Sequence, residues 1–343
     1  MVNDRSPIAV TMGDPAGIGG EITIKGWIKD HSSETYPFFL IDDPVRIQNT
    51  ARRMNVDIPI RSIEKPELAN EVFAQALPIL EERLNMDIAE GVSSSSATKT
   101  IIRSIDRALD AVVSGAASAM VTNPINKSTL YDAGFPYPGH TEYLANQTKT
   151  QKPAVMMLAT ANLRVVPATI HLSLRDAIDA LSIDRIVLCT TTTARALKQD
   201  FGINRPRIAV AGLNPHAGEE GFLGREEIEI ITPAINQLRA AGLNVTGPFS
   251  SDTLFHETAR EKYDVVICMY HDQALIPSKT IDFFNGVNIT LGLPIVRTSP
   301  DHGTAMDIAG TNRANPNSLI AAIKVAGQIA ATRQDTANAR ENS

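Results

Sequence analysis

Three histidines directly follow apolar runs that are typical of β-strands. The run "LRVVPATI" leads to His171, "PRIAVAGLNP" leads to His216, and "DVVICMY" leads to His271. In open parallel α/β sheets, ligands gather outside the carboxyl ends of the strands. Three imidazoles delivered there could bind one metal ion and leave positions open for substrate oxygens. A hydrogen-bonded loop histidine is the alternative at each position, because no contiguous motif such as HExxH is present.

A second group of polar residues has the composition of a phosphate-binding site. It comprises His140, Thr141 and Glu142 in "GHTEYLA", then Lys279, Asn288 and Arg297 after the third histidine. The first three follow a glycine turn and precede a helix, whose N-terminal amides favour anions. Arginine binds phosphate through two parallel hydrogen bonds, and lysine acts as a point charge. Solvated surface charge is the alternative for any one of them alone.

The run "MGDPAGIGGE" contains four glycines directly after an expected strand. A dinucleotide-binding turn of the Rossmann type needs the spacing G-x-G-x-x-G, and a P-loop needs G-K-[ST]. Neither pattern fits, so we interpret the run as a tight strand-to-helix turn that lines the cleft.

Short apolar runs alternate with helical periodicity along most of the chain. Strands are predicted at residues 7–12, 36–41, 118–123, 163–170, 206–213 and 263–270, several of them apolar throughout. Continuous apolar runs are typical of strands covered on both faces, as in parallel sheets. Helices are predicted at 97–115, 182–202 and 225–242, each ending at glycine. The alternation predicts an α/β fold with a largely parallel sheet, and the polar end is expected to fray beyond residue 331.

Composition narrows the class of protein. The 343 residues are 43% hydrophobic and 20% charged, with a net charge of −6 and no long basic run, which argues against a nucleic-acid partner. Cys189 and Cys268 lie in strand-like apolar runs and are expected to be buried, reduced thiols. The sequence shows no signal-peptide core and no apolar stretch near the ~20 residues that span a bilayer. We therefore expect a cytoplasmic protein without a membrane partner.

Seven segments together resemble the 4-hydroxythreonine-4-phosphate dehydrogenase family of vitamin B6 biosynthesis. They are "TMGDPAGIGGE", "VTNPINK", "GHTEYLA", "GLNPHAGEEGFLGREE", "SDTLF", "YHDQALIPSK" and "GVNITLGLPIVRTSPDHGTAMDIAG", and the similarity runs from residue 8 to residue 325. The resemblance implies two α/β/α domains with mostly parallel sheets, similar to isopropylmalate dehydrogenase. The active-site cleft is then expected between the domains and at a dimer interface. Residues 1–135 with 285–343 would form the cofactor-side domain, and 136–284 the metal-binding and dimerisation domain.

The resemblance also implies an activity. The family oxidises 4-phosphooxy-L-threonine at the C3 hydroxyl with NAD or NADP, giving 2-amino-3-oxo-4-phosphooxybutanoate. This product decarboxylates to 3-amino-2-oxopropyl phosphate on the route to pyridoxal phosphate. A divalent metal (Zn, Mg or Co) and a homodimer with a metal site shared between the subunits are expected from the same resemblance.

Site residues carry over from the matching motifs. The metal ligands are His171, His216 and His271, and the substrate contacts are His140, Thr141, Lys279, Asn288 and Arg297. The cofactor residues are His302, Gly303, Thr304, Asp307 and Asn315. Asp252 and Lys279 are both candidates for the base that takes the hydroxyl proton. Asp272 is expected to orient a ligand histidine or to cap its loop.

The chain departs from the family pattern at four places. Gly20 and Ser173 replace prolines, Asn123 replaces an alanine and is expected beside the cleft, and "SSDT" replaces "PADT" while keeping Asp252. These changes leave open a catabolic relative that oxidises D-threonate or D-erythronate 4-phosphate. An enzyme similar to the phosphate acyltransferases is the alternative from another class.

Overall fold

The chain divides into two compact units in the computed structural model, which describes residues 6–31, 36–151 and 153–341. Unit 1 comprises Met1–Gln151 and Leu293–Ala331, and unit 2 comprises Lys152–Gly292 and Thr332–Ser343. Residues 136–151, expected in the second domain, group with unit 1, and residues 285–292 group with unit 2. Within the described ranges, no helix is both long enough and apolar enough to cross a bilayer.

Unit 1 contains six parallel strands in the order β3-β4-β2-β1-β5-β12. Their bounds are β1 Ile8–Thr11, β2 Phe38–Asp42, β3 Ile60–Ile63, β4 Leu77–Glu81, β5 Ala119–Val121 and β12 Arg297–Pro300. Every residue of β1, β2, β5 and β12 is buried. The apolar runs of β1, β2 and β5 predict this for strands covered on both faces, whereas β12 has the polar sequence Arg-Thr-Ser-Pro and is not among the predicted strands.

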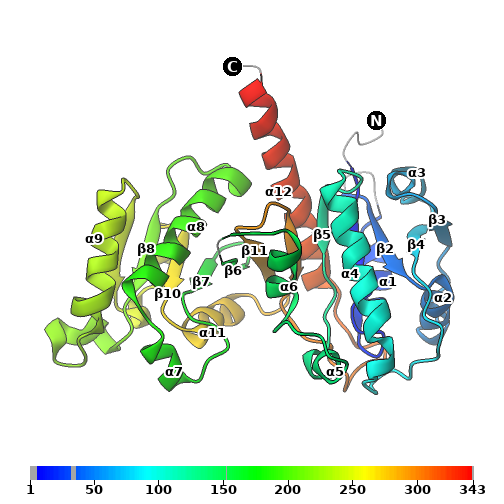
Figure 1. Ribbon diagram of the computed structural model, residues 1–343, viewed down its shortest axis with the longest axis horizontal. Helices are drawn as coiled ribbons and strands as arrows, with labels where there is room; N and C mark the ends of the chain where they lie inside the picture. The colour runs from blue at the N-terminus through cyan, green and yellow to red at the C-terminus, as the bar shows by residue number, and fades with distance from the viewer. Residues whose placement is uncertain (1–5, 32–35, 152, 342–343) are drawn as a thin grey trace. The chain divides into compact units, whose positions relative to one another are not determined.

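The helices of unit 1 follow its strands in alternation (Figure 1). They are α1 Gly19–Lys29, α2 Pro44–Arg53, η1 Pro66–Leu68, α3 Ala69–Val72, η2 Ser95–Ala97, α4 Thr98–Val113, α5 Lys127–Asp132 and α6 His140–Gln147. The helix predicted over 97–115 is confirmed as α4 with its preceding turn η2, and it packs on β1, β2 and β5.

Unit 2 contains strands in the order β11-β6-β7-β10-β8-β9. Their bounds are β6 Val155–Ala159, β7 Arg164–Pro167, β8 Ile208–Ala211, β9 Val245–Phe249, β10 Val265–Cys268 and β11 Val287–Leu291. Strands β7, β10, β8 and β9 are parallel, whereas β6 is antiparallel to both β7 and β11. The expected α/β fold with mostly parallel strands is confirmed.

Helices of unit 2 pack on the same strands. They are α7 Leu174–Asp179, α8 Ile183–Phe201, η3 Pro215–Gly221, the π-helix η4 Glu227–Ile231, α9 Thr232–Ala240, η5 Ser251–Thr253, α10 Glu257–Arg260 and α11 His271–Ile281. Helices α8 and α11 both contact β6 and β10, and Figure 1 draws β7 and β10 between them. Leu158, Val165, Ala209 and Cys268 join in the buried cluster beneath the strand ends.

The helix predicted over 182–202 is confirmed as α8, and Cys189 is buried in it as expected. One expectation about these elements is wrong. The chain does not fray after residue 331, because α12 (Asn317–Glu341) continues to Glu341. Within unit 2, Arg333 donates from Nε to the buried carboxylate of Asp200 at 2.8 Å and holds this last part of the helix.

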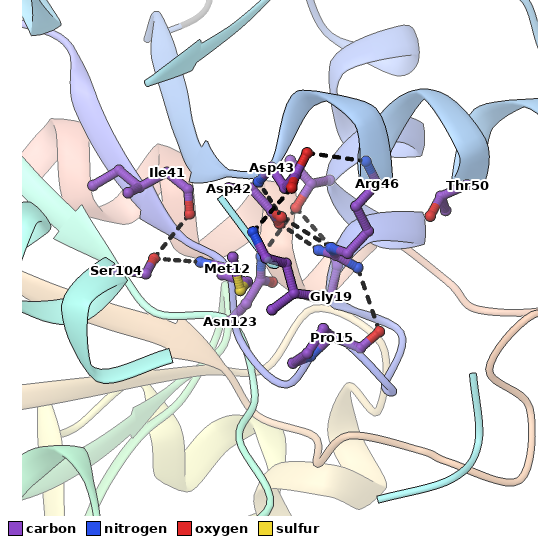
Figure 2. Close-up of polar contacts among 12 residues, drawn as sticks. Met12, Pro15, Gly19, Ile41, Asp42, Asp43, Arg46, Thr50, Ser104 and Asn123 are labelled. Atoms are coloured by element: carbon purple, nitrogen blue, oxygen red, sulfur yellow. Dashed lines mark hydrogen bonds and ion pairs between the residues drawn. The ribbon is translucent and has the colours of Figure 1, made fainter. Parts of the chain in front are cut away.

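A buried ion pair stabilises the strand-to-helix turns of unit 1 (Figure 2). Arg46 on α2 is paired with Asp42 at the end of β2, whose carboxylate is completely buried, and its guanidinium also donates to the Pro15 carbonyl at 3.4 Å. A Cβ at Gly20 would lie 3.2 Å from the Arg46 guanidinium, so the glycine at this position leaves room for the pair. Asp43 caps α2 by accepting from the Val45 amide at 2.8 Å.

Replacing Arg46 should destabilise unit 1. Arg46→Met leaves the Asp42 carboxylate buried without its cation, a change that costs about 3–5 kcal/mol. Urea denaturation followed by the fluorescence of Trp27, the single tryptophan, buried in unit 1, measures the effect. The matched control is Arg83→Met, which removes an exposed pair with Glu81 and should leave the transition unchanged. Equal midpoints for the two variants would contradict this account.

Candidate active site

The strand order of unit 2 brings the three predicted histidine positions to one edge of the sheet. His171 follows β7, His271 follows β10 and His216 follows β8. These strands are immediate neighbours in the order β7-β10-β8, and both pairs are parallel. Their carboxyl ends therefore lie at the same edge, where ligands of parallel α/β sheets bind.

His171 and His271 lie in one pocket. Their ring centroids are 5.9 Å apart, and both rings line a pocket of about 210 Å³ together with Thr169, Tyr270 and Asp272. His271 is the first residue of α11, and its Nδ1 lies 2.7 Å from Asp272 Oδ1. A histidine with Nδ1 bound to a carboxylate has its ring orientation fixed and keeps Nε2 for a ligand. The contact between Asp272 and His271 is the one that the sequence predicts.

The charge of His216 contributes to the electrostatic surroundings of Asp252. Ser250 donates to Asp252 at 2.5 Å and is the largest cause that lowers the pKa of this carboxyl, with a smaller contribution from His216. Asp252 lines a second pocket of about 430 Å³ with Ser251, Phe255 and Gln273. Tyr270 and Asp272 line both pockets, so the two hollows are adjacent.

Two of the histidines have a backbone conformation that is uncommon for their type. His171 has φ of 54° and His216 has φ of 51°, both in the left-handed region. Non-glycine residues in this region cluster at functional sites, because the surrounding structure must impose the conformation. Ser173, which replaces a proline of the family pattern, caps α7 by accepting from the Asp176 amide at 3.2 Å.

Gln273 connects the strand ends that carry these groups, although it is not among the predicted site residues. Its Oε1 accepts from the Met269 amide at 2.6 Å, and its Nε2 donates to the Gly212 carbonyl at 2.7 Å and to Ser251 Oγ at 2.8 Å. The side chain is buried. One amide thus links the end of β10, the end of β8 and the turn that carries Asp252. A glutamine two residues after a strand-end histidine is the signal that could have pointed to it.

The donor set suits a divalent metal, although one chain does not assemble it fully. Imidazole nitrogens suit Zn²⁺ and Co²⁺. Among the described residues, no group of three or more histidines, cysteines and carboxylates is placed to hold a metal ion. The structure brings His171 and His271 together, and the three-histidine set stays a prediction.

Three of the predicted substrate residues lie in unit 1. His140 and Thr141 begin α6, directly after Gly139. Arg297 on β12 is buried and donates to Thr122 Oγ1 from Nε at 3.1 Å and from a terminal nitrogen at 2.6 Å. Burial lowers the pKa of Arg297 to about 10, opposed by the charge of Glu142, so it remains a cation at neutral pH.

The His140 ring is held in a neutral form. Burial is the largest cause that lowers the pKa of His140 well below 6.5, and the charges of Arg297 and Lys127 act in the same direction. Its Nε2 is shielded from solvent and has no hydrogen-bond partner among the described residues. A buried polar atom without a partner is costly, which fits an atom reserved for a ligand.

The other two predicted substrate residues lie in unit 2. Lys279 is on α11, with Nζ 5.3 Å from the centroid of the Phe283 ring. Asn288 is on β11, and its Oδ1 is buried without a hydrogen-bond partner in the described part of the chain.

The predicted cofactor residues lie in unit 1, in the segment between β12 and α12 that packs on α1. Ile18 donates from its amide to the Thr304 carbonyl at 3.1 Å, and Lys25 donates to the carbonyls of Asn312 and Ala314, both at 2.8 Å. A Cβ at Gly17 would lie 2.9 Å from the Thr304 carbonyl oxygen, which explains a glycine there. The N-terminal glycine turn therefore supports this segment.

Individual cofactor residues differ in their surroundings. A Cβ at Gly303 would meet no atom within 4 Å, so the backbone there is open to a ligand. His302 Nδ1 lies 3.0 Å from the Gly303 carbonyl oxygen, and Asn315 Oδ1 accepts from the Asn317 amide at 2.9 Å at the start of α12. Thr304 contributes its carbonyl to the contact with α1, and Asp307 lies in the same segment.

Asn123 lies in the interior of unit 1, and its expected place beside the cleft stays a prediction. It is completely buried, and its Nδ2 donates to the Thr11 carbonyl and to Thr23 Oγ1, both at 3.0 Å. This amide joins β1 to α1 beneath the glycine turn.

The neutral state of His140 can be measured. We expect the Hε1 resonance of His140 in the ligand-free protein to stay constant from pH 8 down to the ordinary histidine pKa of about 6.5, because protonation occurs only well below that value. In Arg297→Met the pKa should rise but stay below 6.5, since burial is the larger cause. A wild-type titration centred at or above 6.5 would contradict the burial argument.

Comparison with known proteins identifies the family. A family model described as "Pyridoxal phosphate biosynthetic protein PdxA" matches residues 34–326. A Caulobacter vibrioides protein named 4-hydroxythreonine-4-phosphate dehydrogenase is 49% identical over 332 residues, covering 95% of this chain and 98% of that protein. A crystal structure of the enzyme of that name from Klebsiella pneumoniae has a TM-score of 0.86 at 42% identity, covering 95% of this chain and 98% of that chain.

A structure with a different name is also similar over most of the chain. The terephthalate 1,2-cis-dihydrodiol dehydrogenase from Burkholderia xenovorans LB400 has a TM-score of 0.62 at 27% identity, covering 94% of this chain and 98% of that chain. The family model and the Caulobacter and Klebsiella proteins match along nearly the whole chain and carry related names. The chain therefore belongs to the PdxA family of pyridoxal phosphate biosynthetic proteins.

Proposed function

We propose that this chain is a 4-hydroxythreonine-4-phosphate dehydrogenase. It would oxidise the C3 hydroxyl of 4-phosphooxy-L-threonine with NAD or NADP and a divalent metal, and the product would decarboxylate to 3-amino-2-oxopropyl phosphate. Family membership supports the reaction. The main observation in support of the site is that three histidines follow adjacent parallel strands, which end at one edge of the sheet.

His171, His216 and His271 would hold the metal, with Asp272 orienting His271 through the 2.7 Å contact. When bound, a divalent ion lowers the pKa of a coordinated hydroxyl and polarises the ketone formed from it. Imidazole ligands fit Zn²⁺ and Co²⁺. Mg²⁺, the other metal expected, is a hard cation that prefers oxygen ligands.

Asp252 and Lys279 remain the two candidates for the base that takes the hydroxyl proton. The lowered pKa of Asp252 keeps it ionised at neutral pH, able to accept a proton but intrinsically a weaker base. Asp252 also lines the pocket next to the one that contains His171 and His271. This position supports a role for Asp252 close to a substrate bound at the histidines.

Phosphate binding is assigned to residues that supply positive charge or hydrogen-bond donors. In unit 1, Arg297 is a buried cation with planar donors, and neutral His140 and Thr141 supply further hydrogen bonds at the start of α6. In unit 2, Lys279 supplies a point charge and Asn288 a side-chain amide on β11. These assignments fit a phosphorylated hydroxy amino acid.

The nicotinamide cofactor, which accepts the hydride, would bind at His302, Gly303, Thr304, Asp307 and Asn315. The open backbone at Gly303 and the support of this segment by α1 favour the assignment.

A homodimer with a metal site shared between the subunits is part of the proposal. Leu172 and Leu174 line the pocket of His171, Ile276 lines the second pocket, and all three are exposed apolar side chains that a partner subunit could cover. A cytoplasmic location is supported by the two free, buried cysteines.

The test is NADH or NADPH formation by the purified chain with added Zn²⁺, Co²⁺ or Mg²⁺. Three substrates are compared: 4-phosphooxy-L-threonine, 4-phospho-D-threonate and 4-phospho-D-erythronate. We expect turnover with the amino acid phosphate that is lost on chelation and restored by metal. His216→Ala should abolish this turnover while retaining the fold.

The contrary outcomes are distinct. A preference for either sugar-acid phosphate would assign the chain to a catabolic reaction at the same site. Activity that is unchanged by chelators would contradict the requirement for a metal. Acyl transfer without NADH formation would favour the phosphate acyltransferase alternative, in which the three histidines have no role.

A further inference from the structure

The turn that carries His216 has a left-handed backbone conformation, which L-amino acids normally avoid. Residues 216–221 all have positive φ, and four of them are not glycine: His216, Ala217, Glu219 and Glu220. Left-handed conformation is unfavourable for each of these residues and does not persist in a free loop. Contacts from outside the turn must therefore impose it.

A buried carboxylate holds the residues that lead into this turn. Glu227 is 4% exposed, and its Oε1 accepts from the backbone amides of Leu213 at 2.7 Å and Asn214 at 2.8 Å. Its Oε2 accepts from the side-chain amide of Asn214 at 2.9 Å. Three donors on the two residues that precede Pro215 thus converge on one side chain.

Glycines make room for this carboxylate inside the turn. A Cβ at Gly218 would lie 2.6 Å from Glu227 Oε2, and a Cβ at Gly212 would lie 3.1 Å from Glu227 Oε1. The Glu227 side chain therefore fills the space that the left-handed turn encloses, beside both the strand end and the turn itself.

The carboxylate is carried by a rigid support. Glu227 is the first residue of the π-helix η4, which continues into α9. Ile231, Ala234 and Ile235 on these helices are buried in the core of unit 2, and α9 packs on β9 and α8. π-Helical turns are rare and often occur at functional sites.

We propose that Glu227 is a positioning residue for His216, acting by fixing the left-handed turn that presents the imidazole. The inference rests on the proposed role of His216 as a metal ligand. Residues that orient metal ligands without touching the metal typically change metal affinity by about 10- to 100-fold when replaced.

The test compares three variants of the full-length protein. Glu227→Ala removes all three hydrogen bonds. Glu227→Gln keeps an oxygen for the Leu213 and Asn214 amides but turns an NH₂ group toward the Asn214 side chain. Glu229→Gln is the matched control, because Glu229 lies on the same π-helix, is exposed and pairs only with Arg225 among the described residues, at 2.6 Å.

The first readout is amide hydrogen exchange of the metal-free protein, which does not depend on activity. We expect exchange of residues 212–224 to accelerate by roughly 10-fold or more in Glu227→Ala, as for loss of hydrogen bonds to a charged group. Glu227→Gln should be intermediate and Glu229→Gln unchanged. The acceleration should be confined to this segment, whereas a general loss of stability would raise exchange throughout β8, β10 and α9.

The second readout is Co²⁺ affinity from the visible absorption of the bound ion. We expect Glu227→Ala to bind Co²⁺ about 10- to 100-fold more weakly, Glu227→Gln to recover part of the loss, and Glu229→Gln to match the wild type. His216→Ala serves as the reference for loss of the ligand itself.

Two results would overturn the proposal: exchange that accelerates evenly over unit 2 in Glu227→Ala, or wild-type Co²⁺ affinity in Glu227→Ala while His216→Ala has lost it. Wild-type affinity in His216→Ala would instead contradict the metal role of His216, and the exchange of residues 212–224 alone then decides whether Glu227 fixes the turn.

Discussion

The parallel register of β7, β10 and β8 is the constraint on which the candidate site depends. Parallel neighbours end at the same edge, so the residues that follow them emerge on one side of the sheet, and the turns then set where each histidine lies. Gln273 then fixes the strand ends relative to one another through hydrogen bonds to Met269, Gly212 and Ser251. A buried amide with all these partners is a rigid connection, because leaving any of them unpaired would cost about 1–3 kcal/mol. The histidines therefore sit on a scaffold that is set before any ligand binds.

Backbone strain is concentrated at the same edge. His171 and His216 both have positive φ, and the His216 turn holds three further non-glycine residues in that region. Each such residue costs about 1–2 kcal/mol, which the fold tolerates only where buried contacts compensate. Glu227 supplies those contacts for the His216 turn, and the Ser173 cap holds the start of α7 just after His171. Because an imidazole side chain is short, a rigid backbone at its base fixes the direction in which it points.

Much of this arrangement could be predicted from the sequence, because it depends on local pattern. Continuous apolar runs identified the buried strands, and the histidines after them were visible as residues at strand ends. The left-handed turn, the role of Glu227 and the connections of Gln273 could not be predicted, since each depends on contacts between distant segments. The same reason explains one error: α12 continues past residue 331, where Arg333 meets Asp200.

The most direct test of the central claim is anomalous diffraction at the zinc edge from crystals of the chain grown with Zn²⁺. The account predicts one ion bound by the imidazole nitrogens of His171, His216 and His271 at about 2.0–2.1 Å, with the ligands drawn from two subunits. An ion held by other groups, or crystals with full Zn²⁺ occupancy elsewhere and none at these imidazoles, would contradict it.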